Sequence, residues 1–322
     1  MKSIGGYFEL ELNRGALVHR EAMALNSARN CLKLLLLSRK AKVVYVPYYT
    51  CEVVVQTLQE LDVKITFYNI DRSLEIESVP ELGEKEVLLY TNYFGIKDTY
   101  IRNLAEKYGK SLIIDNAQAF FSTPIPGIST FYSPRKFFGV SDGGFLYSDM
   151  EIPEYGFLEH DISYNRMLHL LKRSDVSAEY GFGDFQENER ALDSAPIRRM
   201  SVITRKILDS IDYRAVCRQR IKNFKYVHSF LGEFNRLPIS HDSMSVPMVY
   251  PFLHDNSIGL VEYLQKNKVY VARYWPNVLE WCDKVVLEYT LASTLISVPI
   301  DQRYTQIEMS YIISLILKYI KK

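Results

Sequence analysis

Residues 129–144 read STFYSPRKFFGVSDGG, and they are the stretch from which the fold and its chemistry are best approached. Lys136 lies between two aromatic runs and is followed by Gly139 and by the pair Gly143-Gly144. A lysine in apolar surroundings is held partly as the uncharged amine, because burial disfavours the ammonium form. An uncharged amine is a nucleophile that forms an imine with an aldehyde. The alternative interpretation is a solvated surface lysine whose methylene stem covers a hydrophobic patch.

Short apolar runs alternate with amphipathic runs on the N-terminal side of this stretch. Strands are predicted at 43–47, 64–71, 87–94, 111–115, 129–133 and 143–149, and helices at 27–40, 51–62 and 99–110. Such alternation predicts an α/β fold with a mostly parallel central sheet and helices on both of its faces. In sheets of this kind ligands bind beyond the carboxyl ends of the strands. The residues that follow the strands are therefore the candidates for a site.

The pattern changes in the second half of the chain. Residues 154–225 are mostly helical and polar, and residues 226–322 are mixed. Apolar runs occur there at 246–253, 269–276 and 295–300, with a helix predicted at 257–266 and a last helix from Gln306. We therefore predict a large α/β domain over residues 1–215 and a smaller C-terminal α+β domain over residues 216–322.

Composition excludes several classes of protein. The 322 residues are 48% hydrophobic and 24% charged, as in ordinary globular domains. There are 39 Lys+Arg against 38 Asp+Glu, so the net charge of +1 gives no argument for nucleic acid or an anionic membrane as partner. The four cysteines form no C-x-x-C pair, and no His or Cys spacing suggests a metal site. With no signal-peptide pattern at the N-terminus, we expect a soluble cytoplasmic protein.

One further strand end and the start of one helix carry polar groups. Asp115 ends the apolar run 111–115, and a buried carboxylate is costly unless it meets a cation or a strong donor. Residues 26–30, NSARN, open the first helix and could bind an anion with their free N–H groups. The alternatives are ordinary capping by Asp115 and by Asn26 or Ser27. Taken together, an anion site, a carboxylate and an amine match the phosphate, the ring nitrogen and the aldehyde of pyridoxal 5′-phosphate (PLP).

The ordered set of motifs resembles the DegT/DnrJ/EryC1/StrS family of PLP-dependent sugar aminotransferases, which have the fold-type-I architecture of aspartate aminotransferase. The matching segments are NSARN (26–30), VYVPYYT (44–50), TNYFG (91–95), IDNAQA (114–119) and FYSPRKFFGVSDGG (131–144). LISVPI (295–300) before the last helix resembles the family's ending. The resemblance covers most of the chain.

The resemblance implies a role for each matched residue. Lys136 would bond to the cofactor's aldehyde and carry the proton at the substrate carbon, and Asp115 would keep the ring nitrogen protonated. Gln118 would lie near the ring's 3-hydroxyl. Ser27, Ala28 and Arg29 would bind the phosphate, the last two through their backbone N–H groups.

The chain departs from the family at the phosphate. Ala28 and Arg29 stand where the family usually has Gly and Thr, so a hydroxyl is lost and the Arg29 side chain is a candidate replacement. Phe131 stands at the position of the family's phosphate-binding Ser, for which Ser133 or Thr130 could substitute.

It also departs around the ring and the substrate. The ring-stacking aromatic of the family aligns with Cys51, so Tyr49, Tyr93 or Phe94 could cover the ring instead, and the histidine of the fourth-strand motif is Asn92. Tyr93 is also a candidate for the substrate site. Further candidates for substrate contacts, from regions that match the family poorly, are Arg198, Arg199 and Trp275, for which a solvent-facing helix start and a core position are the alternatives.

The function implied by the resemblance is transfer of an amino group from an amino acid, such as glutamate, to a keto-sugar. The sugar is expected to be nucleotide-linked and to serve surface polysaccharide or lipopolysaccharide biosynthesis, in a homodimer with shared sites. A PLP-dependent lyase or dehydratase would use the same Lys136 and Asp115. A non-catalytic relic of the fold acting as a binding protein is the third alternative, motivated by the altered phosphate loop and Cys51.

Overall fold

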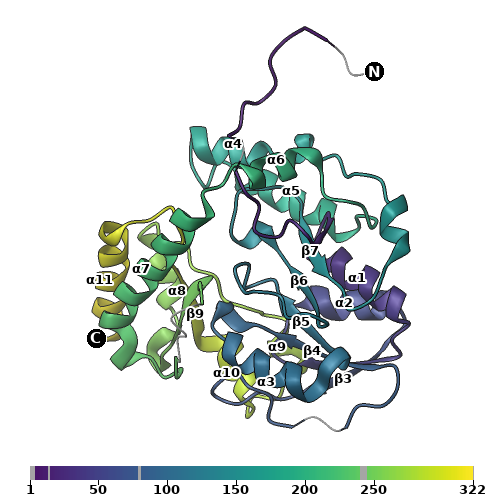
Figure 1. The fold of residues 1–322 in the computed structure, drawn as a ribbon. Helices are drawn as coiled ribbons and strands as arrows, with labels where there is room; N and C mark the ends of the chain where they lie inside the picture. Colours follow the sequence, from purple (N-terminus) through teal and green to yellow (C-terminus); the bar gives the residue numbers. More distant parts are fainter. Residues whose placement is uncertain (1–3, 14, 79–80, 240–244, 322) are drawn as a thin grey trace.

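A seven-stranded sheet forms the centre of the molecule, with a two-stranded sheet beside it (Figure 1). The computed structural model describes residues 4–13, 15–78, 81–239 and 245–321. The strands of the large sheet lie in the order β1-β7-β6-β5-β4-β2-β3. Their bounds are β1 (Met23–Leu25), β2 (Val43–Pro47), β3 (Lys64–Tyr68), β4 (Glu86–Thr91), β5 (Leu112–Asn116), β6 (Ser129–Tyr132) and β7 (Gly144–Tyr147).

Most neighbouring strands in this sheet are parallel, as predicted. β2 pairs in parallel with β3 and β4, β4 with β5, and β5 with β6. β7 is antiparallel to both β6 and β1. The α/β prediction with a mostly parallel sheet is confirmed. The parallel strands end at one edge, so the residues that follow β4, β5 and β6 lie near one another.

Both faces of the sheet are apolar because alternate residues of each strand point to opposite faces. Val87 and Leu89 of β4 pack with α1 and α2, whereas Leu88 and Tyr90 pack with α3 and the C-terminal helices. The same alternation in β5 divides Ile113 from its two neighbours. A sheet buried in this way reads in sequence as continuous apolar runs.

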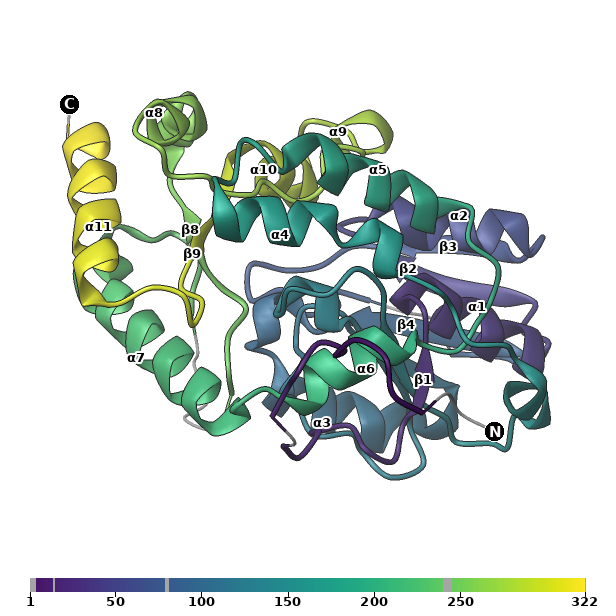
Figure 2. The same cartoon turned by 90° about the horizontal axis from the view of Figure 1, so that it is seen from above.

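Helices cover both faces and extend beyond one end of the sheet (Figures 1 and 2). Their bounds are α1 (Ala28–Arg39), α2 (Glu52–Glu60), α3 (Asp98–Tyr108), α4 (Leu168–Asp175), α5 (Phe182–Asp193), α6 (Val202–Asp209), α7 (Tyr213–Leu231), α8 (Leu260–Lys266), α9 (Val278–Trp281), α10 (Leu287–Thr294) and α11 (Gln306–Ile320). None of the described helices is long and apolar enough to cross a membrane.

The C-terminal part has its own small sheet. β8 (Val249–Leu253) pairs in antiparallel fashion with β9 (Leu295–Pro299), and α7 packs beside α11. Figure 2 shows α7, α8 and α11 grouped around this pair of strands. This arrangement agrees with the predicted α+β character. We propose that the smaller domain begins within α7, at the predicted boundary between residues 215 and 216.

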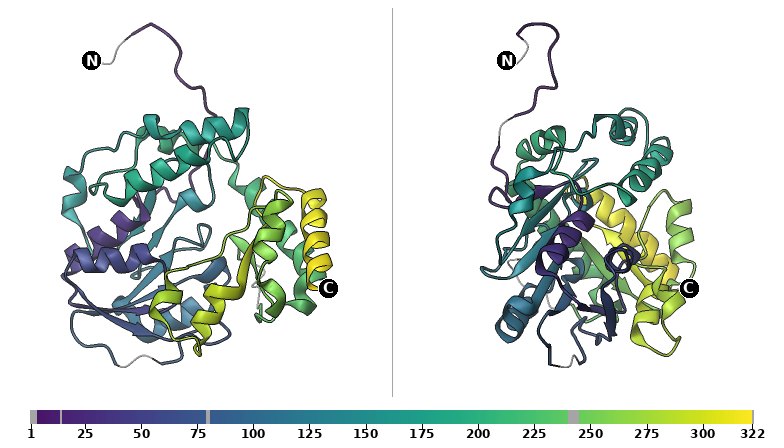
Figure 3. Two further views of the ribbon diagram at one scale, coloured as in Figure 1. Left: turned by 180° about the vertical axis from the view of Figure 1, so that it is seen from behind. Right: turned by 90° about the vertical axis from the view of Figure 1, so that its right-hand side faces the viewer.

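The N-terminal arm contacts the body of the molecule through Glu9, whose carboxylate lies 2.6 Å from Lys206 Nζ of α6. It extends away from the sheet in Figures 1 and 3. Its apolar side chains Ile4, Tyr7 and Phe8 are each more than nine-tenths exposed. Exposed aromatic side chains in an extended segment are typical of a surface that packs against another chain.

Some sequence predictions were wrong at element ends. The strand predicted at 87–94 ends at Thr91, because residues 93–95 form a 3₁₀ turn in which Phe94 has a left-handed φ of 57°. The apolar run 269–276 forms no strand and makes only an isolated bridge between Ala272 and Ser297. β1 was not predicted, because three residues are too few to show alternation.

His19 joins the N-terminal segment to the sheet. Its Nε2 lies 2.7 Å from the carbonyl oxygen of Phe120, its Nδ1 lies 3.2 Å from the hydroxyl of Tyr147, and its ring packs on Tyr132. Burial lowers the pKa of His19 to about 4, while the hydrogen bond to Phe120 acts in the opposite direction. The neutral imidazole is therefore the form that the fold stabilises.

We predict that His19 makes the fold sensitive to mild acid. Its folded-state pKa lies below the ordinary value of 6.5, so the unfolded chain takes up the proton first and stability is lost as pH falls from 6.5 toward 4. The expected loss between pH 7 and pH 5 is about 2 kcal/mol. Urea unfolding at both pH values measures it. A His19→Gln variant with the same pH dependence as the wild type would contradict the prediction.

Candidate functional site

Lys136 lies just beyond the carboxyl end of β6. Pro134 begins a 3₁₀ turn (Pro134–Lys136), and the N–H groups of Phe137 and Phe138 both donate to its carbonyl oxygen at 2.9 Å. The fixed φ of proline suits the first position of such a turn. The turn leaves Lys136 exposed, so the expectation of a buried lysine is wrong.

A cavity of about 200 Å³ lies beside Lys136. It brings together many of the residues predicted for the cofactor, namely Ser27, Ala28, Arg29, Cys51, Asp115, Ser133 and Lys136. The remaining lining residues come mainly from α1, α2, the region of β5 and β6, and α5, and are Leu32, Val53, Val54, Thr57, Ala117, Phe131, Arg135, Glu189, Leu192 and Asp193. The sheet thus places amine, carboxylate and helix N-terminus around one space.

Asp115 supplies the carboxylate at the end of β5. It is only 7% exposed, and its Oδ1 accepts a hydrogen bond of 2.8 Å from the N–H of Ala117. Burial raises the pKa of Asp115, and the Lys136 cation and the Ala117 N–H oppose that shift. A buried carboxylate on a cavity wall is stabilised by a cationic N–H placed opposite it.

We predict that Asp115 reduces the stability of the ligand-free protein. Its raised folded-state pKa means that the folded chain holds the proton more tightly, so stability falls as pH rises from the ordinary carboxyl pKa through the raised value. Asp115→Asn removes this cost and is expected to stabilise the protein at pH 8 by about 1 kcal/mol. Urea unfolding measures the difference, with the exposed Glu187→Gln as the matched neutralisation. A less stable Asp115→Asn variant would contradict the prediction.

The N-terminus of α1 reaches the cavity because β7 passes very close to it. A Cβ at Gly144 would lie 2.5 Å from the carbonyl carbon and oxygen of Ser27 and 2.7 Å from the nitrogen of Ala28. Only glycine fits there. The Ser27 hydroxyl caps α1 by accepting from the N–H of Asn30 at 3.1 Å. The cap and the close approach together present the first turn of α1, with its positive dipole end, to the cavity.

Comparison with known proteins supports this architecture. No family model and no curated protein matches the chain. Among solved structures, a DegT/DnrJ/EryC1/StrS aminotransferase from Brucella abortus is 16% identical, with a TM-score of 0.65 over 94% of this chain and 86% of that one. The sugar aminotransferase CalS13 from Micromonospora echinospora is 12% identical, with a TM-score of 0.62 over 92% and 87%. NtdA from Bacillus subtilis, solved with its bound cofactor PMP, is 14% identical, with a TM-score of 0.67 over 94% and 73%.

The chain has the fold of the sugar aminotransferases. The three solved structures match more than nine-tenths of this chain at TM-scores of 0.62 to 0.67, so the predicted resemblance is confirmed at the level of the fold.

Within the sugar-aminotransferase fold, Gln118 lies buried beside the cavity rather than on its wall. Its Oε1 accepts a hydrogen bond of 2.8 Å from the N–H of Phe94. Its Nε2 is buried and lacks a hydrogen-bond partner in the described structure. An unpaired buried donor costs free energy and suits a ligand acceptor. The Asp115 carboxylate and the cations that line the cavity fit the ring nitrogen and the phosphate of PLP, whereas Gln118 lies outside that lining.

Cys51 lies on the cavity wall, as the resemblance of its motif implied. Burial raises the pKa of its thiol, against the opposing effect of the Lys136 cation. The thiol is therefore protonated at neutral pH and acts as a small apolar group. It contributes packing at this position and no ring to stack.

Asn92 is not brought to the cavity. Its Nδ2 donates to the Oδ1 atoms of Asp98 and Asn116 and to the Ser122 hydroxyl, at 2.8, 3.0 and 3.1 Å. These contacts fix the turn after β4. Its cofactor role remains a proposal without support from this geometry.

The aromatic residues predicted near the ring form a buried cluster of their own. The Tyr93 hydroxyl donates to the Tyr49 carbonyl oxygen, and the Tyr49 hydroxyl donates to that of Tyr274. Trp275 packs edge-on against Tyr49 at a ring distance of 4.8 Å. Tyr49, Tyr93 and Trp275 do not line the cavity beside Asp115.

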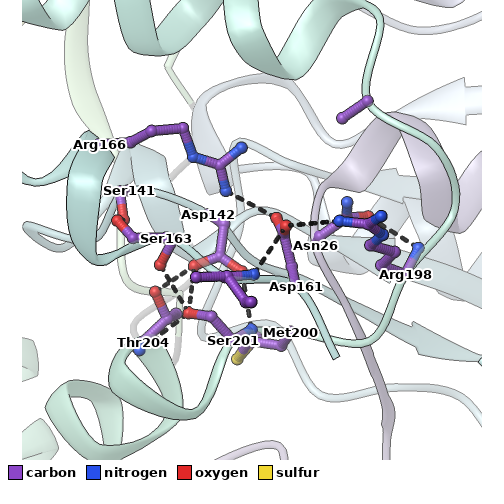
Figure 4. Close-up of polar contacts among 12 residues, drawn as sticks. Asn26, Ser141, Asp142, Asp161, Ser163, Arg166, Arg198, Met200, Ser201 and Thr204 are labelled. Atoms are coloured by element: carbon purple, nitrogen blue, oxygen red, sulfur yellow. Dashed lines mark hydrogen bonds and ion pairs between the residues drawn. The ribbon is translucent and has the colours of Figure 1, made fainter. Parts of the chain in front are cut away.

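Arg198 and Arg199 do not line the cavity beside Lys136. Figure 4 shows Arg198 close to Asp161 and Asn26. Arg198 approaches Asp161 at 3.8 Å, and Arg199 donates to the carbonyl oxygens of Leu158 and Gly156. Both side chains therefore hold the segment after β7. A substrate contact for either one remains a proposal.

The segment 134–144, which carries Lys136 and is called the lysine loop below, ends close to α6. Figure 4 shows the contacts of Asp142 that hold this end in place. Asp142 is fully buried, and its carboxylate accepts from the N–H of Ser201 at 2.8 Å and from the hydroxyls of Ser201 and Thr204. A carboxylate at the start of α6 also interacts favourably with the helix dipole. The Asp142 position therefore ties the loop to α6.

Sequence reasoning missed the contribution of α5. Glu189, Leu192 and Asp193 line the cavity from this helix. Arg135 pairs with Glu189, and Arg29 pairs with Asp193. The only available signal was the spacing of the two acids four residues apart, which places them on one helix face. Nothing in that spacing indicates which part of the sheet the face would meet.

A second cavity, of about 680 Å³, shares Lys136 and Arg135 with the first. Among its described lining residues, Arg173, Arg220 and Arg303 add cations, and Asp301 adds one carboxylate. Asp301 is already paired with Arg303 at 2.7 Å. Excess positive charge of this kind favours an anionic ligand.

Arg220 connects this second cavity to the lysine loop. It donates to Gln302 Oε1 at 2.9 Å, and Gln302 donates to the Phe137 carbonyl oxygen at 2.8 Å. Its guanidinium lies 4.6 Å from the centre of the Phe137 ring. These contacts hold the residue after Lys136 against the C-terminal part of the chain.

Proposed function

We propose that this protein is a PLP-dependent aminotransferase that moves an amino group from an amino acid, with glutamate as the expected donor, to a nucleotide-linked keto-sugar. The observation that carries the proposal is the single cavity that joins the Lys136 amine, the Asp115 carboxylate and the N-terminus of α1. Surface polysaccharide or lipopolysaccharide biosynthesis in the cytoplasm is the setting that the resemblance suggests.

The residues of the cavity divide the work between binding and proton transfer. PLP supplies an electron sink for the electrons left when a C–H bond is broken. Asp115 would hold a proton on the ring nitrogen, because its buried carboxylate requires a cationic partner. Lys136 Nζ would hold the cofactor by its aldehyde group and, once the donor's amino group has taken its place there, the freed amine would carry the α-proton of the donor. Ser27 and Ala28 present the helix N-terminus to the phosphate.

The second cavity supports an anionic acceptor. It opens on the same Lys136 and carries more arginine than carboxylate. A diphosphate or a dicarboxylic donor would be bound there by guanidinium groups. Trp275 and Tyr93 lie outside its lining, so the arginines are the stronger candidates for substrate recognition.

We also propose a homodimer with sites shared between subunits. The N-terminal arm exposes aromatic side chains, and Phe157 and Tyr164, in the segment between β7 and α4, are also exposed. A second copy of the chain would cover such apolar side chains. Light scattering is expected to give twice the mass of one chain. A monomer at micromolar concentration would count against shared sites.

A non-catalytic binding protein is the second candidate. The exposure of Lys136 and the pairing of both cavity arginines with carboxylates favour it, since these features describe a site already neutralised within the chain.

The deciding experiment is an absorbance spectrum of the full chain with PLP, before and after adding glutamate. A visible band that is lost in Lys136→Ala, is kept in the exposed control Lys225→Ala and is bleached by glutamate would support the aminotransferase. A Lys136-dependent band that no amino-acid donor bleaches would overturn transamination and favour a lyase. The absence of a band in every protein would overturn the cofactor assignment and favour the binding protein.

A further inference from the structure

One end of the first cavity is built from two arginines. Arg29 begins α1 and has a side chain that is only 9% exposed, and Arg135 precedes Lys136 and has a side chain that is 18% exposed. Both line the cavity. Arg135 Nε is buried without a hydrogen-bond partner in the described structure. Two guanidinium groups beside a helix N-terminus make this end strongly cationic.

The counter-ions of both arginines come from one face of α5. Arg29 Nη2 lies 2.8 Å from Asp193 Oδ1, and Arg29 also donates to the Asp193 carbonyl oxygen. Arg135 pairs with Glu189. Residues four apart lie on the same side of a helix, so α5 presents two carboxylates together to two arginines.

The two sides of these ion pairs differ in their access to water. The Asp193 side chain is 59% exposed and that of Glu189 is 42% exposed, whereas the arginines are nearly buried. The carboxylates are hydrated when they turn into solvent, so the cost of breaking the pairs falls mainly on the arginines. The arginines would then remain facing the cavity without counter-ions, which is unfavourable unless another anion enters.

A phosphate monoester meets this requirement in charge and in geometry. It carries a charge between −1.5 and −2 at about pH 7, so it replaces two carboxylates with almost no change in net charge. Its oxygens accept the paired N–H groups of a guanidinium fork. Phe131 lines this cavity and offers no hydroxyl, and the two arginines add charged donors to the hydroxyls of Ser27, Thr57 and Ser133 in the same lining.

We propose that Arg29 and Arg135 form the phosphate-binding pair of this cavity, and that a phosphate monoester binds by displacing the α5 carboxylates Asp193 and Glu189. The inference rests on the proposed function where the monoester is PLP. It assigns α5 a definite part in cofactor binding, as the source of competing anions.

The helix need not leave its place for this exchange. Asn30 Nδ2 donates to the carbonyl oxygens of Ala195 and Pro196 at 3.2 and 3.0 Å, and Asn26 Nδ2 donates to that of Pro196 at 3.0 Å. These bonds fix the segment after α5 to the start of α1. Rotation of the two acidic side chains is sufficient.

The test measures binding of inorganic phosphate, PLP and unphosphorylated pyridoxal to the full chain by calorimetry. Asp193→Asn and Glu189→Gln are each expected to tighten phosphate and PLP about fivefold, since each removes a competing anion. Pyridoxal is expected to be unaffected. The control Glu187→Gln removes the same charge from α5 but does not line the cavity. Arg135→Gln and Arg29→Gln are expected to weaken phosphate binding by tenfold or more.

Arg135→Lys keeps the positive charge but loses the paired N–H groups of the guanidinium. It is the conservative variant to use if Arg135→Gln does not fold. An intermediate loss of phosphate affinity in Arg135→Lys supports the pair, and a wild-type affinity overturns it. Equal phosphate affinity in wild type, Asp193→Asn and Glu189→Gln overturns the exchange, even if PLP still gives a Lys136-dependent band. If phosphate affinity changes in these variants but PLP gives no Lys136-dependent band, the arginine pair is supported. In that case only the assignment of PLP as the cofactor is overturned.

Discussion

Lys136→Ala is expected to lower the rate of amino transfer by at least about a thousandfold. Lys136 is the lysine among the described residues that line the first cavity, and the arginines beside it do not release protons at neutral pH. Neither Arg29 nor Arg135 can therefore take over its proton transfer. Asp115 lies on the same wall but is committed to the ring nitrogen in the proposed mechanism.

The measurement is a single-turnover reaction with glutamate, followed by absorbance and by the amount of keto acid formed. Lys136→Arg is expected to be as inactive as Lys136→Ala, because it restores the charge without an amine that can lose a proton. Lys225→Ala, on the exposed side of α7, is expected to match the wild type. A Lys136→Ala rate within tenfold of the wild type would show that another group carries the proton.

Gly144→Ala is expected to destabilise the protein by about 3 kcal/mol. The added Cβ would lie 2.5 Å from the carbonyl carbon and oxygen of Ser27, and these backbone atoms cannot move without shifting α1 or β7. The same shift would displace the first turn of α1 from the cavity, so phosphate affinity is expected to fall as well.

Urea unfolding followed by circular dichroism measures this effect. Gly156→Ala is the matched control, because an added Cβ there would meet no atom within 4 Å. We expect the control to remain within about 0.5 kcal/mol of the wild type. An unfolding midpoint for Gly144→Ala equal to that of the control would refute the close approach between β7 and α1.

The sequence was sufficient to predict those parts of the fold whose pattern is local. The runs at 43–47 and 129–133 were predicted almost to the residue, because apolar β-branched and aromatic side chains buried on both faces leave an unbroken signal. The last helix was predicted from Gln306, and α11 begins there; in the structure Thr305 and Glu308 form a capping box at this start.

The site residues that follow strands were predicted from the sequence. The residues that reach the site by packing between distant segments were not. Asp115, Lys136 and the start of α1 come together because parallel strands end at one edge. The α5 face that meets them lies in a segment whose polar composition indicates a helix but no partner. Lys136 was expected to be buried between aromatic residues, but it is exposed at the end of the turn that Pro134 begins.

Three contacts determine the length of the segment between Pro134 and Gly144. They are the turn at Pro134, the hydrogen bonds of Asp142 to α6, and the close approach of Gly144 to α1. One end is set by a turn, the other by a buried carboxylate and by contact with a helix. Insertions or deletions between 136 and 144 would shift the lysine relative to the sheet. During evolution or in library design, this segment is therefore expected to vary in sequence but to keep its length.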